Sequence, residues 1–463
     1  MSSVQQAVKA RRVDLTTGPV ASKLIALAWP LFVGNILNTF YNLADMYWVS
    51  WVSTDAVAAV AITFPTVWLT FSFGLGVTIA GTAFVARHFG AGQPDQAAKV
   101  TGQVLLLATL VGALLGGVGA FLRVPILRMM GAQDAVLEMA SVYLLIEFLG
   151  LPLRYAYFAY RSVSQGAGDS KTPRNLLIFS VGLNMVLDPF FILGLAGLPS
   201  MGVLGAAWAT FISQGIGALL SLVILFRGRM AGVALRLHHF RPDLRLLGQV
   251  ARVGLPASLD MGARGLSSVV VAAIVSRFGA VEAAAYGIVN RLMSVTWTSA
   301  GAMEQAVASG VGQSLGAKDP RRAARIGWTG AGIMFAFLTA VGLCLFVFPE
   351  AVVGIFRVEE HVNATAVRFL RLHVLSYGFW GMRDVLQGAF RGAGHTLPPA
   401  VITWLNLWVA QIPLSLWTSY ALGWGADGYW IVLCATNLVF AAVASIWFRF
   451  GSWQESKRPG QRP

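Results

Sequence analysis

One apolar stretch near the start of the chain carries four polar residues at the spacing of a single helix face. Asn35, Asn38, Asn42 and Asp45 follow one another at steps of three, four and three residues, so an α-helix places them on one side. A carboxylate and three amides are costly to expose to hydrocarbon, so they must face protein or water. We interpret this face as a functional site; the alternative is a polar seam that hydrogen-bonds a neighbouring helix.

A second acid follows in a later apolar stretch. Asn184 and Asp188 are four residues apart on one helix face, and Pro189 follows directly. Proline removes one helix hydrogen bond and so frees a carbonyl oxygen beside the acid. Carboxylate, amide, hydroxyl and carbonyl oxygens are the ligands that a small hard cation prefers. A dry site would instead hold a protonated carboxyl group. Both designs suit ion coupling, and the alternative is an acid with a purely structural role.

The elements that must position these residues are membrane helices. Of the 463 residues, 56% are hydrophobic and only 12% are charged, which is typical of an all-α polytopic membrane protein. Apolar segments of about 20 to 30 residues recur along the chain, long enough to span a bilayer. The sequence predicts twelve transmembrane helices, at about 20–50, 55–85, 98–122, 137–160, 173–196, 202–226, 246–276, 283–310, 323–348, 364–388, 398–420 and 428–450.

The distribution of basic residues predicts the orientation of these helices. Lys and Arg are concentrated in alternate loops, whereas the opposite loops hold few of them. By the positive-inside rule, the basic loops and both termini are cytoplasmic. This topology accounts for the net charge of +14, so we expect no nucleic acid as a partner.

The two halves of the chain repeat at a constant offset of 226 residues. Pro30 matches Pro256, and the Gly-Ala-Gly triplet at Gly166 matches the one at Gly392. Six helices per repeat is an even number, so both repeats enter the membrane from the same side and form two pseudo-symmetric lobes. The predicted parts are an N-terminal six-helix lobe (1–226), a basic cytoplasmic linker (227–245), a C-terminal six-helix lobe (246–450) and a cytoplasmic tail (451–463).

The halves do not match in charge. At the same offset Asp45 corresponds to Val271, and neither Asn184 nor Asp188 has a polar counterpart. Paired acids are therefore expected in the N-terminal lobe alone.

Other charged residues inside the predicted helices have separate interpretations. Asp260 and Arg264 are one helical turn apart and predict an ion pair. Arg383 and Asp384 are adjacent, so we expect them to face different ways. The sequence leaves open the roles of Asp260, Arg264, Arg291, Glu304, Arg383, Asp384 and Glu147.

No group of residues predicts catalysis. The six histidines lack zinc-ligand spacing, and Cys344 and Cys434 lie inside apolar segments. No Walker-type motif is present, so the chain is not itself an ATPase. We expect no enzyme and no cofactor, and the same absence argues against a membrane-embedded enzyme or receptor.

The chain resembles the multidrug and toxic compound extrusion (MATE) family over nearly its whole length. The residues that carry the resemblance are Trp29-Pro30, Asp45, Asn184-xxx-Asp188-Pro189, Gly205-Ala206-Ala207-Trp208-Ala209-Thr210 and the repeated Gly-Ala-Gly triplets. The Asn184 and Asp188 pair is similar to the DinF-like branch. The NorM-like branch has a glutamate on helix seven, where this chain has Arg264, so coupling through the C-terminal lobe is not expected.

The resemblance implies an antiporter in which protons or sodium ions flow inward while amphipathic, often cationic, drugs leave by alternating access. The implied coupling and substrate-binding residues are Asp45, Asp188, Asn184, Thr210, Tyr41, Asn42, Asn38 and Tyr143, with Pro30 as the helix-bending residue. Sodium, where it is the coupling ion, would be held by Asp45, Asn184, Asp188 and Thr210. The expected partners are small amphipathic cations and the lipid bilayer. A monomer in a bacterial or archaeal plasma (inner) membrane is expected, and the sequence distinguishes neither H⁺ from Na⁺ nor one substrate from another.

One alternative function comes from the same superfamily. A flippase of lipid-linked oligosaccharides would need cationic residues in the cleft for a pyrophosphate, and Arg264, Arg291 and Arg383 are such residues. Two extra helices common in one branch of such flippases are absent from this sequence.

Overall fold

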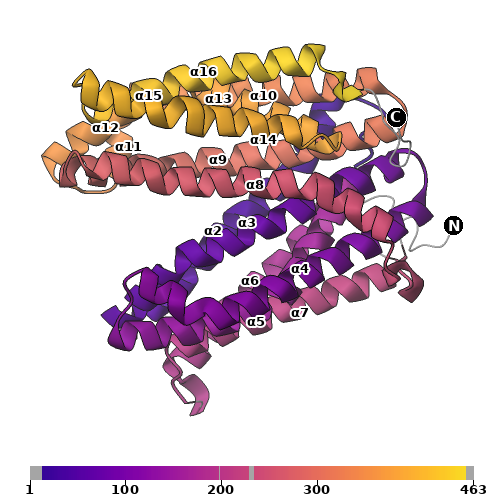
Figure 1. Ribbon diagram of the computed structural model, residues 1–463, viewed down its shortest axis with the longest axis horizontal. Coiled ribbons are helices and arrows are strands. Elements are labelled where there is room, and N and C mark those ends of the chain that lie inside the picture. Colours follow the sequence, from indigo (N-terminus) through magenta and orange to yellow (C-terminus); the bar gives the residue numbers. More distant parts are fainter. Residues whose placement is uncertain (1–12, 198, 229–233, 455–463) are drawn as a thin grey trace. The chain divides into compact units, whose positions relative to one another are not determined.

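The computed structural model describes residues 13–197, 199–228 and 234–454, and the regular elements in these residues are all helices. Part of the predicted linker (229–233) and most of the predicted tail (455–463) lie outside the described residues. The elements are α2 (Val20–Val49), α3 (Thr54–Gly90), α4 (Pro94–Met129), α5 (Asp134–Gly166), α6 (Lys171–Leu193), η1 (Leu195–Gly197), α7 (Val203–Phe226), η2 (Leu237–Phe240), α8 (Leu244–Ser276), α9 (Ala280–Gly316), α10 (Pro320–Val347), α11 (Pro349–Gly354), α12 (Glu360–Val374), α13 (Tyr377–Gly392), α14 (Leu397–Trp404), η3 (Leu405–Gln411), α15 (Ile412–Leu416), η4 (Trp417–Ala421), α16 (Ala426–Phe450) and η5 (Ser452–Gln454) (Figure 1).

Ten helical stretches among the described residues are long and apolar enough to cross a membrane, with α14 to η4 counted as one stretch. The other two predicted spans are α9 and the pair α12 and α13. The all-α prediction is therefore confirmed, and six of the twelve predicted helices extend at least three residues beyond a predicted end.

Two predicted spans are less regular than the sequence suggested. The tenth is divided, because α12 ends at Val374 and α13 begins at Tyr377. Between them the Ser376 hydroxyl donates to the carbonyl of His373 (3.0 Å), a local bond that competes with helical continuation. The eleventh contains π-helical turns, and η3 lies just before Pro413, whose ring nitrogen has no hydrogen to give to the preceding turn.

The repeated residues mark equivalent helix ends. Gly168 and Gly394, 226 residues apart, have φ of 85° and 81°, a left-handed conformation that favours glycine. Each follows the end of a long helix, α5 or α13. Pro94 and Pro320 occupy the first turns of α4 and α10, where a missing N–H costs nothing. The constant offset therefore reflects backbone conformations that both halves require.

The chain forms two compact units, which we call unit 1 (Met1–Asp14 and Trp29–Ser258) and unit 2 (Leu15–Ala28 and Leu259–Pro463). These units differ from the predicted lobes at two helices. The first part of α2 belongs to unit 2, and the first part of α8 belongs to unit 1. Both divisions fall next to the repeat-related prolines Pro30 and Pro256.

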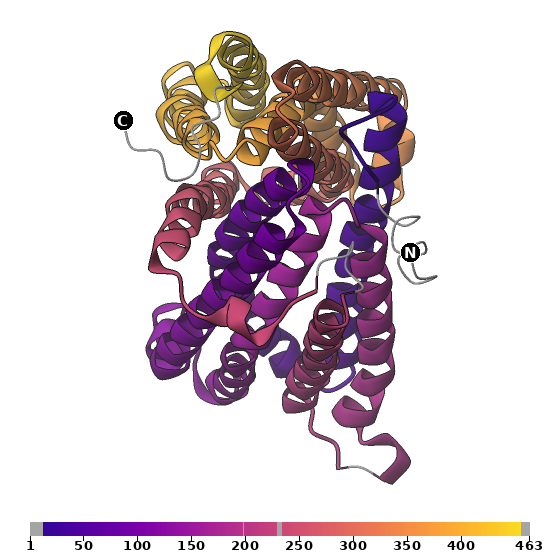
Figure 2. The same ribbon diagram turned by 90° about the vertical axis from the view of Figure 1, so that its right-hand side faces the viewer.

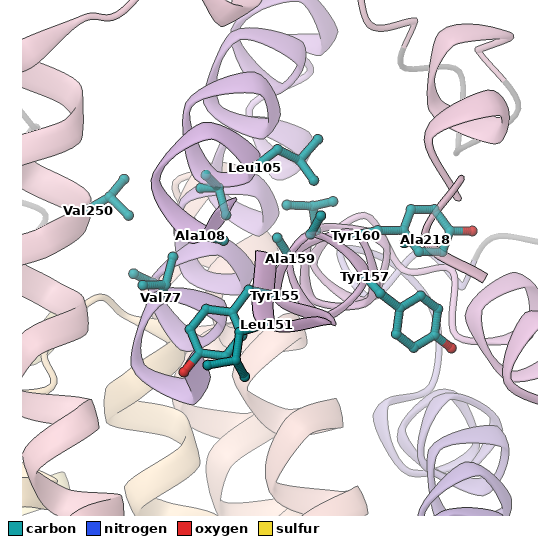
Figure 3. Close-up of a cluster of buried hydrophobic side chains, with 14 of the residues drawn as sticks. Val77, Leu105, Ala108, Leu151, Tyr155, Tyr157, Ala159, Tyr160, Ala218 and Val250 are labelled. Carbon is teal, nitrogen blue, oxygen red and sulfur yellow. The ribbon is translucent and has the colours of Figure 1, made fainter. Parts of the chain in front are cut away.

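In unit 1, α5 packs against α3, α4 and α7. The core between these helices contains Val77, Leu105 and Tyr155 (Figure 3). A Cβ atom at Gly112 of α4 would lie 2.8 Å from the carbonyl oxygen of Leu151 on α5, so glycine permits this approach. Small residues at helix contacts are characteristic of membrane bundles.

The connection between α7 and α8 is tied to unit 1, because η2 packs on α4 (Figure 2). Gln103 of α4 donates to the carbonyls of His239 (2.7 Å) and Arg241 (2.8 Å). Lys99 forms an ion pair with Asp243 (2.6 Å), the residue before α8. In unit 2, α13 packs against α9, α10 and α16.

Candidate ion and substrate site

Asp45 of α2 and Asp188 of α6 lie next to each other inside unit 1, about one turn before the ends of their helices. Asp188 and Asn184 are fully buried, and Asp45 is 9% exposed. The two carboxyl groups are within hydrogen-bonding range of each other. Asn184 Nδ2 donates to Asp188 Oδ1 (3.0 Å), and Thr210 Oγ1 donates to Asp45 Oδ2 (3.4 Å). The structure thus gathers four of the implied residues from α2, α6 and α7, and we call them the acid pair site.

Three oxygen atoms of the acid pair site have no hydrogen-bond partner. They are Asp45 Oδ1, Asn184 Oδ1 and Asp188 Oδ2, and all three are buried. Among the residues that the structure describes, no Lys or Arg forms an ion pair with either acid. Two carboxylates in contact repel each other, and a shared proton or a bound cation relieves the repulsion.

The chemistry of the donor atoms limits which cation fits. All are carboxylate, amide or hydroxyl oxygens, a set suited to a hard cation such as Na⁺. The described residues contain no cluster of three or more His, Cys, Asp or Glu side chains that could hold a metal ion. The three unpartnered oxygens are acceptors to which a proton or a cation can bind.

A line of polar side chains connects the acid pair site to an ion pair on α5. The hydroxyl groups of Tyr41 and Thr210 are close enough to interact. Gln214 Nε2 donates to Tyr41 Oη (3.4 Å), and Arg154 Nε donates to Gln214 Oε1 (2.7 Å). Arg154 Nη2 in turn lies 2.7 Å from Glu147 Oε2. This acid, unlike the acid pair, is matched by a cation on its own helix.

The other implied residues lie at varying positions relative to the acids. Tyr143 of α5 is half-buried and within electrostatic range of Asp45. Asn38 is exposed, and the side chain of Asn42 lies outside the described residues. Pro30 precedes Asp45 by 15 residues, about 22 Å along a helix. Of the described residues on this face of α2, Asp45 is the one that the structure places against the second acid.

Sequence reasoning missed two residues of α7 that contact the tyrosine. Tyr41 is close enough to Ser213 to interact with it, and its hydroxyl accepts a hydrogen bond from Gln214. Thr210, Ser213 and Gln214 follow one another at three and one residues and share a helix face. The helical spacing that singled out α2 would have detected them.

A group of acids in unit 2 is matched by arginines. Asp260 lies 3.4 Å from Arg264 Nε, which confirms the predicted ion pair. Asp260 also pairs with Arg391, which reaches Glu304 as well. Arg264 Nη1 lies 3.3 Å from Asp384 Oδ2. We call these residues, with Arg383, the arginine–acid cluster.

The prediction that Arg383 and Asp384 face different ways is wrong. Arg383 Nη2 lies 3.3 Å from Asp384 Oδ1, and both side chains are buried. Arg383 Nη1 also donates to Asn437 Oδ1 (3.0 Å). The long arginine side chain lets its guanidinium return to a neighbour whose Cβ points elsewhere.

Comparisons with known proteins give consistent results. The MatE family model matches residues 30–190 and 256–417, whose first residues are 226 positions apart. The "Probable multidrug resistance protein YoeA" of Bacillus subtilis (strain 168) is 30% identical over 406 residues, which is 87% of this chain and 88% of that protein. The "FAD transporter" of Shewanella oneidensis is 25% identical over 92% of this chain and 94% of that protein. A crystal structure described as "MATE in the bent conformation" has a TM-score of 0.88 at 24% identity and covers 97% of each chain.

These matches confirm the predicted fold of twelve helices in two lobes. They also confirm that the chain is a multi-pass membrane transporter and not an enzyme. The relatives named above are a drug-resistance protein and a FAD transporter, so the flippase alternative is not favoured. Since the family model matches both halves, and a 30% identical relative matches over most of its length, the chain belongs to the MatE family of transporters.

Proposed function

We propose that this transporter is an ion-coupled antiporter that exports amphipathic, often cationic compounds by alternating access, with H⁺ or Na⁺ as the coupling ion at the acid pair site. One observation carries the proposal: two buried carboxyl groups from different helices touch, and neither has a basic partner among the described residues. Such a pair is electrostatically incomplete and gains most when a proton or cation is added.

Antiport follows when the ion and the cargo stabilise different arrangements of the same helices. Ion binding draws Asp45 of α2 and Asp188 of α6 together, whereas a bound cationic compound competes for the same negative charge. A ligand shifts a conformational equilibrium only by its difference in affinity for the two states. Loss of the ion therefore releases α2. Pro30 lies inside α2, and a proline in a helix supports bending at that position.

The charge of the acid pair site supports cationic cargo. Its members carry two carboxyl groups and no cation, so an anionic compound would be repelled. A relative is named FAD transporter, and FAD is an anionic dinucleotide, but that name belongs to that protein. The proposed coupling residues lie in the N-terminal half, which supports an assignment to the DinF-like branch. The Lys and Arg residues in alternate loops support a topology with both termini in the cytoplasm.

The decisive experiment is transport of a fluorescent cationic dye by the purified protein in liposomes, with a proton gradient and a sodium gradient imposed separately. We expect one gradient to drive uptake against the dye gradient, and collapse of that gradient by an ionophore to stop it. An anionic dye of similar size is the matched control. Dye transport at the same rate with and without either gradient would refute ion coupling. Faster transport of the anionic dye than of the cationic dye would refute cationic compounds as the substrate class.

A further inference from the structure

A small pocket in unit 1 places two arginines beside the proline of α2. It is lined by Pro30 and Gly34 of α2, by Arg161 of α5, and by Ser170 and Arg174 at the start of α6. The pocket is far from the acid pair site, because Pro30 lies about four turns before the acid of α2. No residue of the proposed coupling mechanism except the bending proline lines it.

The two guanidinium groups at this pocket are held by amide oxygens. Arg161 is half-buried, and its Nη2 donates to Asn35 Oδ1 (2.7 Å). Arg174 donates to Asn175 Oδ1 through Nη2 (2.8 Å) and Nε (3.2 Å). Within the described part of the chain, neither arginine forms an ion pair. Amides orient a guanidinium but leave its charge uncompensated.

The most buried arginines elsewhere in the spanning helices are neutralised. Arg154, Arg264, Arg383 and Arg391 each contact a carboxylate of this chain. Arginine is rarely taken out of water without such a partner. Arg161 has no such carboxylate partner among the described residues, so its charge is open to an anion from outside the chain.

The acid nearest to the pocket in sequence is already engaged. Asp169, in the loop between α5 and α6, is 3% exposed and accepts hydrogen bonds from the backbone N–H (2.9 Å) and the hydroxyl (2.6 Å) of Thr172. It thus closes the first turn of α6. The exposed Lys171 adds a further positive charge at the same helix start.

Two guanidinium groups and a serine hydroxyl around one pocket are the chemistry of phosphate recognition, because an arginine fork matches two phosphate oxygens. Arg161 lies five residues before the end of α5, about 7.5 Å along the helix, so it is close to one end of this long helix. We propose that Arg161 and Arg174, beside this small pocket, bind the phosphate group of an anionic phospholipid, and that the bound phosphate holds the Pro30 turn of α2 against α5 and α6. Free inorganic phosphate has the same chemistry, so the test must separate the two sources.

The test measures binding and does not depend on transport. The full-length protein is placed in nanodiscs of phosphatidylcholine with and without phosphatidylglycerol, and its unfolding temperature and retained lipids are measured. We expect phosphatidylglycerol to raise the unfolding temperature of the unaltered protein. Arg161→Gln and Arg174→Gln should each weaken the apparent lipid affinity about tenfold or more, the size of one lost charge-assisted hydrogen bond.

Arg252→Gln is the matched control, because Arg252 is exposed on α8 and does not line the pocket. It should keep the full effect of phosphatidylglycerol. An equal loss in the control would overturn the proposal, because it would show general surface attraction. A full effect in both Arg161→Gln and Arg174→Gln would overturn it too, and Arg174→Gln carries the test if the first variant does not fold. A further outcome is that inorganic phosphate raises the unfolding temperature in phosphatidylcholine nanodiscs for the unaltered protein and not for Arg161→Gln, with no effect of phosphatidylglycerol. That result would show a phosphate site and refute the phospholipid as its source.

Discussion

The acid pair site of unit 1 and the buried acids of unit 2 differ in how their charges are compensated. In unit 1, Asp45 and Asp188 contact each other and leave oxygens without partners. In unit 2, Asp260 and Glu304 are bonded to Arg391, and Asp260 to Arg264 as well. The same repeated fold therefore holds one acid group that is open to an added positive charge and one that is already neutral.

This difference suggests separate roles for the two groups of charges: ion coupling for the acid pair site and structural support for the arginine–acid cluster. Three acids and three arginines make up the arginine–acid cluster, so its charges balance without an ion. A balanced cluster resists rearrangement, because removal of one partner leaves a buried charge unmatched. The acid pair site has no such restraint. We infer that unit 1 responds to ions and that unit 2 contributes a fixed charge arrangement.

The largest effect is expected from neutralising an acid of unit 1. Asp45→Asn and Asp188→Asn each remove a charge that the coupling ion needs, so dye uptake driven by an ion gradient should fall to that of protein-free liposomes. Unfolding temperature should stay the same or rise, since repulsion is removed. Normal gradient-driven uptake in both variants would end the proposed distinction between the units.

Loss of an arginine in unit 2 should give the reverse pattern. Arg391→Leu leaves Asp260 and Glu304 with less neutralisation in a buried place, and we expect destabilisation of about 3–5 kcal/mol, measured by thermal unfolding. Arg252→Leu, at an exposed position of α8, is the control and should change stability little. A stable Arg391→Leu protein would show that the cluster is not a fixed structural unit.

The line of polar side chains from the acid pair site to α5 should have a moderate effect on the rate of dye transport. Tyr41→Phe removes the hydroxyl that joins Thr210 to Gln214, and dye transport should slow by about two- to tenfold, the worth of one neutral hydrogen bond. Tyr47→Phe is the matched control on α2, because Tyr47 is exposed. Equal rates in the two variants would restrict the coupling site to the two acids and their direct partners.

The smallest effect is expected from a partly exposed acid, Asp243, which is paired with a lysine. The Lys99 ammonium and the backbone N–H of Leu246 hold the pKa of Asp243 below its usual value. The stability from this pair is therefore present above about pH 4 and lost as pH falls through the lowered pKa. Asparagine can still cap the helix, so Asp243→Asn should lower the free energy of unfolding by less than about 1 kcal/mol. This loss should occur only above about pH 4, where the ion pair forms.

The measurement for this pair is unfolding temperature between pH 3 and pH 7, with Asp95→Asn as control because Asp95 is exposed on α4 and forms no ion pair in the described residues. The curves of Asp243→Asn and the unaltered protein should converge toward low pH. A constant difference across the range would show that the Lys99 contact is not the cause.

Local sequence determined the features that depend on spacing alone. The steps between Asn35 and Asp45 placed both on one helix, and the four-residue step placed Asn184 beside Asp188. The 226-residue offset identified equivalent helix ends, because glycine and proline act on the backbone where they stand. The ion pair of Asp260 with its neighbour one turn later was predictable for the same reason.

Tertiary structure alone decided which of these features meet. Asp45 and Asp188 are 143 residues apart in sequence, and their contact depends on how α2 and α6 are rotated against α7. The same holds for Arg391, which pairs with two acids on other helices, and for Arg161, which forms no ion pair with any described residue. Helical periodicity is a property of neighbouring residues, whereas the partner of a buried charge is set by packing between distant helices, and a single sequence does not contain that packing explicitly.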